Sequence, residues 1–185
     1  MTLDSKAAAA ALDDIESMAQ KVRQSQFYQI FALTMILWGA LVLAGNLATF
    51  IAPSYAPAIW ILVNLLGVAG TFGIVAANRG AGDRKGQAWR QLTAFGFYFT
   101  FGFLCIGVLG NVTPRQSGAF WPIYFMLAYM IAGLWLGRAL VFIGAVITAL
   151  TLIGYFFVLG GWFLIWMAAV NGGGLIVAGL WMRRA

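Results

Sequence analysis

The chain has 185 residues, of which 63% are hydrophobic and only 9% are charged, and its formal net charge is +6. A soluble domain is typically about half apolar and a quarter charged, so this composition excludes an ordinary soluble domain and indicates a protein that uses lipid as its solvent. The sequence has no histidine and one cysteine, Cys105, which excludes an intrachain disulfide, histidine metal ligands and histidine proton relays.

Residues 1–25 form the only extended polar stretch. Apolar residues recur there at helical spacing, with acidic and basic residues elsewhere around the wheel, and this predicts a short amphipathic helix on the cytoplasmic side. The apolar positions are Leu12, Ile15, Met18, Ala19 and Val22. The stripe could pack on the rest of the protein, lie on the bilayer surface or pair with a partner helix. Residues 26–185 are predicted to form a single transmembrane domain.

Six apolar runs follow in chain order, each close to the ~20 residues that a helix needs to cross ~30 Å of hydrocarbon. Backbone groups cannot be left unpaired in lipid, so each run is expected to be a helix. The predicted spans are 27–50, 58–77, 92–109, 120–137, 139–159 and 162–182. The fold class is therefore predicted to be all-α, a polytopic transmembrane six-helix bundle with a short cytoplasmic amphipathic helix at its N-terminus.

Turn signals separate these runs. Pro53 and Pro57 bracket the first turn, the polar and basic segment 78–91 predicts a loop, and so does the segment 110–118. Span five follows Arg138 after almost no connection, and Gly160 and Gly161 predict a tight turn before span six. All four prolines are expected in turns or in the first turn of a helix, where a missing N–H costs little.

The basic residues predict the orientation of the bundle. With the N-terminus inside, ten Lys and Arg residues lie on the cytoplasmic side and only Arg115 lies outside, which is a strong positive-inside signal. Each even-numbered span also begins with an outer Trp and ends with an inner Arg. These topology anchors are Trp60, Trp121 and Trp162 on the outer side and Arg79, Arg138 and Arg183 on the inner side. The pattern fits three parallel hairpins, although interfacial Trp and Arg are features that any span acquires.

Two asparagines, Asn64 and Asn171, are the candidate intramembrane polar site. Asn171 precedes three glycines, so the helix could open there and offer backbone carbonyls to a ligand. The same pattern also fits close helix packing, with the amide bonding across the interface. Glycines on spans two and four are expected to form helix-packing faces; they are Gly67, Gly70, Gly133 and Gly137.

No set of residues suited to catalysis is visible. There is no Ser–His pair, acid dyad, CxxC, P-loop or dinucleotide-binding fingerprint, and no charged residue lies within a predicted hydrocarbon core, which counts against proton or cation coupling. We therefore expect no enzymatic activity, no metal, no cofactor and no nucleic-acid partner.

The chain as a whole resembles a family of small bacterial six-span membrane proteins. The resemblance is carried by MILWG (35–39), FWPIYF (120–125), AGLWLGR (132–138), GYFFVLGGWFLIWM (154–167) and GLWMRR (179–184). It is also distantly similar to the acid-resistance membrane protein family, through its Gly- and Trp-punctuated hairpins. The resemblance implies six spans in a bacterial inner membrane and assigns no site residue.

Two functions remain open at this point. The leading hypothesis is a non-enzymatic integral membrane protein, an accessory, sensor-like or stress-response component that binds a cytoplasmic partner through residues 1–25 and the loop 78–91. The alternative is a small permease or channel for a neutral or lipophilic solute, lined by Asn64, Asn171 and the aromatic residues of span three. Both place the protein in the lipid bilayer of the bacterial inner membrane with its two termini in the cytoplasm, and homo-oligomerisation is left open.

Overall fold

The computed structural model describes residues 5–78 and 85–184, and every regular element in these ranges is a helix. The first five long helices are α1 (Ser5–Ile51), α2 (Ala56–Ala77), α3 (Lys85–Leu109), α4 (Pro114–Leu136) and α5 (Arg138–Phe157). A short 3-10 turn, η1 (Pro53–Tyr55), joins α1 to α2. The last pass consists of α6 (Trp162–Met167), a π-helical turn η2 (Ala168–Gly173) and α7 (Gly174–Met182). The predicted all-α fold class is confirmed.

Five segments of the described chain are long and apolar enough to cross a membrane. They lie in α1, η1–α2, α4, α5 and the last pass, and they match five of the six predicted spans. The apolar part of α3, Thr93–Leu109, is shorter. The length and composition of these helices indicate a multi-pass membrane protein. The predicted span 92–109, which corresponds to α3, stays a prediction.

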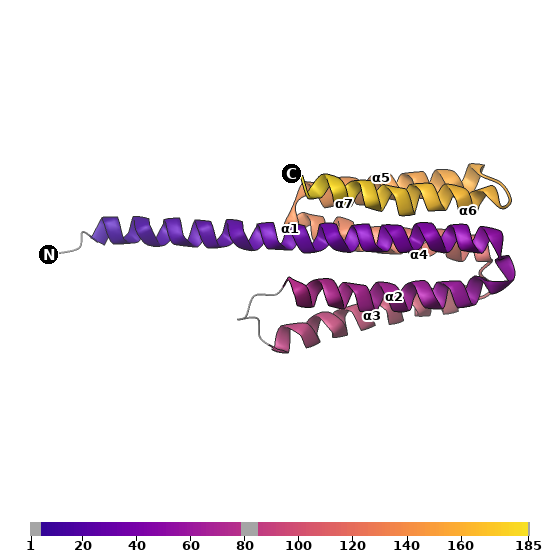
Figure 1. Cartoon of the computed structure of the whole chain (residues 1–185), viewed down its shortest axis with the longest axis horizontal. Coiled ribbons are helices and arrows are strands. Elements are labelled where there is room, and N and C mark those ends of the chain that lie inside the picture. Colours follow the sequence, from indigo (N-terminus) through magenta and orange to yellow (C-terminus); the bar gives the residue numbers. More distant parts are fainter. Residues whose placement is uncertain (1–4, 79–84, 185) are drawn as a thin grey trace.

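Successive helices run in opposite directions through the bundle (Figure 1). The turns after α1, α3 and α5 lie at one end, which we call the outer end. The junction between α4 and α5 and the C-terminus lie at the other, the inner end. Gly160 adopts a left-handed backbone (φ +60°) in the predicted turn before the last pass.

α1 is longer than the sequence analysis predicted. The amphipathic helix and span one form one continuous helix of 47 residues, because no glycine or proline interrupts the sequence between them. At 1.5 Å per residue this helix is about 70 Å long. Its N-terminal part projects beyond the inner end of the bundle (Figure 1), so it does not pack on the bundle, and we call residues 5–26 the stalk.

Two predicted loops are shorter than expected. α3 begins at Lys85, within the predicted loop 78–91, and residues 79–84 lie outside the described residues. α4 begins at Pro114 because Thr113 and Gln116 form a capping box and a proline is well suited to the first helical position. The prediction for Pro122 was therefore wrong: it lies inside α4, where neighbouring helices let a membrane helix tolerate proline.

The main core is shared by α1, α4, α5 and the last pass. Its buried residues are Ala32, Met35, Met126, Leu140, Ile143, Ile147, Leu175, Ala178 and Met182. A smaller cluster near the outer end joins Ala119 of α4 to Phe163 and Met167 of α6. Among the side chains that the structure describes, none of α2 or α3 belongs to either cluster, and we call these two helices peripheral.

Candidate functional site

Asn171 lies in the π-helical turn of the last pass and is 3% exposed. Its amide nitrogen donates to the Thr151 hydroxyl of α5 at 3.2 Å and approaches the Met167 sulfur at 3.5 Å. Thr151 is itself fully buried. The amide is therefore paired across a helix interface, the arrangement expected for helix packing.

Gly172, the first of the three glycines after Asn171, brings the backbone of the last pass against α1. A Cβ on Gly172 would lie 2.5 Å from the Leu43 Cβ, and a Cβ on Gly39 would lie 2.7 Å from the Gly172 carbonyl oxygen. About two turns further on, a Cβ on Gly179 would lie 2.6 Å from the Ala32 carbonyl oxygen. The last pass forms a π-helical turn here and does not unwind. α1 occupies the space beside it that a ligand would need.

Asn64 lies on α2 and is not brought near the same contacts. Its amide donates to the Trp60 carbonyl of its own helix at 2.7 Å. Because one asparagine bonds within its helix and the other pairs with Thr151, the two predicted residues do not form one polar site.

Each predicted packing glycine makes a close approach. A Cβ on Gly67 would meet the Trp38 ring at 2.5 Å, and one on Gly70 would meet Leu37 at 2.7 Å, so both face α1. Gly133 faces Val141 of α5 at 2.6 Å. These glycines let α1–α2 and α4–α5 approach closely, as small residues do in membrane bundles.

Gly137 forms the one-residue junction between α4 and α5. Its backbone (φ +143°, ψ 144°) lies in a region that only glycine adopts readily. The Tyr28 hydroxyl occupies the position of a Cβ there and donates to the Leu136 carbonyl at 2.7 Å. Tyr28 thus joins α1 to the α4–α5 junction at the point where α1 leaves the bundle.

Two of the predicted tryptophan anchors are packing residues as well. The Trp121 ring fills the space above Gly102 of α3, and the Trp60 ring lies 3.7 Å from the Cβ position of Gly45. Trp162 is 70% exposed at the start of α6, as an interfacial anchor would be. Arg138 and Arg183 are exposed at the inner end, and Arg79 lies outside the described residues.

Arg115 closes the outer end of the bundle. From the first turn of α4, its guanidinium donates to the carbonyls of Tyr155 (2.6 Å) and Val158 at the C-terminal end of α5, and its carbon lies 4.6 Å from the Phe163 ring centre. A cation there complements the partial negative charge of a helix C-terminus. Arg115, which the sequence analysis placed outside, therefore has a structural role at this end of the bundle.

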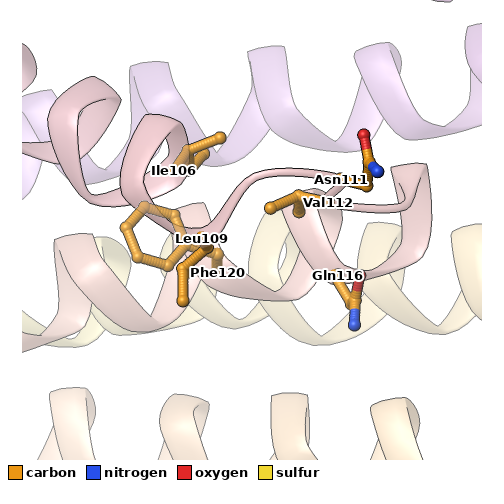
Figure 2. A pocket seen from close by; sticks show the side chains of 6 residues that line it. All are labelled: Ile106, Leu109, Asn111, Val112, Gln116 and Phe120. Atoms are coloured by element: carbon orange, nitrogen blue, oxygen red, sulfur yellow. The ribbon is translucent and has the colours of Figure 1, made fainter.

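A small pocket opens at the outer end between α3 and α4 (Figure 2). Its volume is about 220 Å³, below the ~300–1,000 Å³ typical of ligand sites. The lining residues are Ile106, Leu109, Asn111, Val112, Gln116 and Phe120. The two amides point in opposite directions (Figure 2), so they do not converge on a ligand, and the pocket touches neither Asn64 nor Asn171.

Sequence reasoning missed several of the polar contacts that join helices, and three of them link residues far apart in the chain. They are the Arg115 cap, the Tyr28 contact with Leu136, and the bond from the Trp38 indole to the Thr71 hydroxyl at 3.0 Å. Each pairs residues that are at least 33 positions apart, so no local spacing signals it. In the part of the chain that the structure describes, no three His, Cys, Asp or Glu residues come together as a metal site would require.

Comparisons with known proteins do not assign the chain to a family. No family model matches the chain, no curated protein is similar to it, and no solved structure matches its fold. The resemblance noted from the sequence therefore stays a prediction.

Proposed function

We propose that this chain is a non-enzymatic integral membrane protein that works by binding a cytoplasmic protein, as an accessory, sensor-like or stress-response component. The observation that carries the proposal is the stalk: α1 continues without a break from the bundle and projects about 33 Å past its inner end. A helix that extends this far from the membrane presents a surface that the bundle does not use. The contact with a partner is expected along the stalk and the neighbouring segment 78–91.

The proposed setting is a bacterial inner membrane, crossed six times, with both termini in the cytoplasm. The basic residues support this orientation, because the predicted topology puts ten of the eleven on the cytoplasmic side. The exception, Arg115, is bound to the end of α5. A reporter enzyme that is active only in the cytoplasm should be active when fused after Ala185 and inactive when inserted at Asn111; the reverse pattern would overturn the orientation.

The permease alternative is not developed further. It required a cavity touching both Asn64 and Asn171, and the structure pairs Asn171 with Thr151 while Asn64 bonds within α2. No contact of the described residues favours a solute path.

The test is co-purification from the native host with and without residues 2–22. The deletion should leave membrane insertion intact and remove the cytoplasmic partner from the purified complex. Asn111→Ala, in an exposed outer loop, is the matched control and should retain the partner. If the deletion and the control return the same set of proteins as the unmodified chain, the proposal fails.

A further inference from the structure

The sequence Ala-Gly-Leu-Trp occurs twice, at the inner ends of α4 and α7. The first copy, AGLWLGR, covers residues 132–138, and the second, AGLWMRR, covers residues 178–184. Each copy begins within the last two turns of a membrane-spanning helix and has an arginine at its seventh position. We call them the first and the second inner motif. Neither belongs to the stalk or to the segment 78–91.

The two inner motifs have the same pattern of burial. The glycine of each is buried against a neighbouring helix. The leucine and tryptophan that follow are exposed in both, with Trp135 at 78% exposure and Trp181 at 53%. The arginines at the seventh position, Arg138 and Arg184, are exposed as well. Each motif therefore packs on the bundle with its glycine and leaves a tryptophan and an arginine uncovered.

Contacts with α1 place the two inner motifs at one level of the bundle. The Tyr28 hydroxyl donates to the Leu136 carbonyl of the first motif, and the Cβ position of Gly179 in the second lies 2.6 Å from the Ala32 carbonyl oxygen. Tyr28 and Ala32 are about 6 Å apart along α1. Met182 lies about 4.5 Å nearer the inner end than Gly179, so it is level with Leu136 to within about 2 Å.

The main core holds the residues next to the motif arginines. Leu140 of α5 and Met182 of α7 are buried in that core. Arg138 lies two residues before Leu140, and Arg183 follows Met182 directly. The α4–α5 junction and the C-terminus accordingly lie at the same end of the bundle (Figure 1). The arginines of both motifs are therefore gathered around one end of one core.

These arginines have no partner within the part of the chain that the structure describes. There, no hydrogen bond or ion pair involves the guanidinium group of Arg138, Arg183 or Arg184. The acidic residues of α1 end at Glu16, about 18 Å along the helix from Tyr28. Three guanidinium groups thus keep their donors for an anion that the described residues do not supply.

The arginines lie at the edge of the hydrocarbon. The apolar segment Tyr28–Ile51 has 24 residues, so it is about 36 Å long and spans the ~30 Å of hydrocarbon with its ends at the boundaries. A phospholipid carries its phosphate at this boundary, and guanidinium groups bind phosphate through two parallel hydrogen bonds. Indole rings are enriched at the same level because they are amphipathic.

We propose that Arg138, Arg183 and Arg184, together with Trp135 and Trp181, bind the headgroup of an anionic phospholipid in the leaflet around the inner end. The arginines would bind the phosphate, and the indole rings would pack along the glycerol and the first acyl carbons. A zwitterionic phospholipid has a cation beside its phosphate, so three arginines favour the anionic lipid. This inference does not rest on the cytoplasmic partner proposed above, because the site is separate from the stalk.

Lipid titration of the purified, detergent-solubilised chain tests the site. The probes are phosphatidylglycerol, phosphatidylcholine and inorganic phosphate, and the readout is the rise in Tm as each is added. Only phosphatidylglycerol should give a saturable rise. Changing all three arginines to glutamine should weaken its apparent affinity by about 100-fold, since each basic residue at an anionic lipid surface contributes about fivefold.

The matched control removes the same charge from another part of the chain. Arg79→Gln, Lys85→Gln and Arg90→Gln together also lower the net charge by three, and the affinity for phosphatidylglycerol should stay nearly unchanged. Equal losses in the two triple variants would show an effect of net charge alone and would overturn the proposal. Equal rises in Tm with phosphatidylcholine, or with inorganic phosphate, would do the same, because they would show an unselective lipid contact or a free-phosphate site.

Single variants keep the test decisive if the triple variant does not fold. Arg138→Gln and Arg184→Gln each change one exposed side chain, so Tm without lipid should stay the same. Each should weaken the affinity for phosphatidylglycerol by about fivefold. Full affinity in both single variants would contradict a site formed by the two inner motifs.

Discussion

The last pass meets α1 at backbone-contact distance, whereas α3 touches the rest of the molecule through aromatic side chains. In the first region glycines let the helix backbones approach closely, as at Gly39, Gly172 and Gly179. In the second, Tyr98 of α3 and Tyr124 of α4 stack at 4.2 Å and each donates its hydroxyl to the other's backbone carbonyl. Burial also separates the last pass from the other peripheral helix, α2: 44% of the last pass's most apolar window is buried, against 11% for the window that contains α2.

This difference shows which contacts hold helices together in lipid, where the hydrophobic effect does not drive helix association. Lipid is as apolar as leucine, so close van der Waals packing and hydrogen bonds have to supply the attraction. The last pass and α1 obtain it by close approach. α3 obtains it from a few aromatic and hydrogen-bonded contacts, and two of its glycines, Gly96 and Gly107, face open space. We therefore expect α3 to separate from the bundle more easily than the last pass does.

The largest effect is expected from adding one methyl group to the close contact. In Gly39→Ala the new Cβ would lie 2.7 Å from the Gly172 carbonyl oxygen, and backbone cannot rotate away as a side chain can. Overpacking of this kind costs about 1–3 kcal/mol. Thermal unfolding of the detergent-solubilised protein should show a clear loss of Tm.

The matched control for that variant is Gly107→Ala on α3. Nothing lies within 4 Å of its Cβ position, and alanine is the better helix former, so Tm should stay the same or rise slightly. Equal losses at Gly39 and Gly107 would show that α1 and the last pass are no more closely packed than α3 is.

The next effect is expected at the tyrosine pair. Tyr98→Phe and Tyr124→Phe each remove one hydrogen bond between α3 and α4 while the rings remain, at a cost of about 1 kcal/mol each. The double variant should release α3 without unfolding the core. Hydrogen exchange should therefore rise in α3 and stay unchanged in α5. Tyr55→Phe, an exposed tyrosine at the outer end, is the control, and faster exchange throughout the molecule would contradict a local role.

The sequence predicted where the helices lie better than it predicted which helices contact each other. Span six was predicted within a residue of its observed ends, because long apolar runs bounded by Gly-Gly and Arg-Arg leave few alternatives in lipid. Gly67, Gly70 and Gly133 were also predicted on packing faces, since small-residue spacing is a local signal. The boundaries of α1, α3 and α4 were less accurate, because polar residues continue those helices beyond the hydrocarbon.

The contacts between distant residues could not be predicted from spacing. Arg115 was assigned to an outer loop, and nothing near it in the sequence indicates that its guanidinium binds carbonyls of α5 some 40 positions later. Asn171 was the reverse case: its glycine neighbours fitted both a ligand site and close packing, and only the positions of Thr151 and Leu43 distinguish the two.

The smallest expected effect is a difference in coupling free energy between the two asparagines, Asn171 and Asn64. Asn171→Leu removes a hydrogen bond between helices, which in membranes is worth about 0.6 kcal/mol on average, and Thr151→Val removes the same bond from the other side. A double-mutant cycle on these two positions should therefore give a coupling of about that size. Asn64→Leu removes only a bond within α2, and pairing it with Thr151→Val should give no coupling. A coupling at Asn64 comparable to that at Asn171 would contradict the assignment of the Asn64 bond to α2 alone, because it would mean that Asn64 is linked to Thr151 of α5.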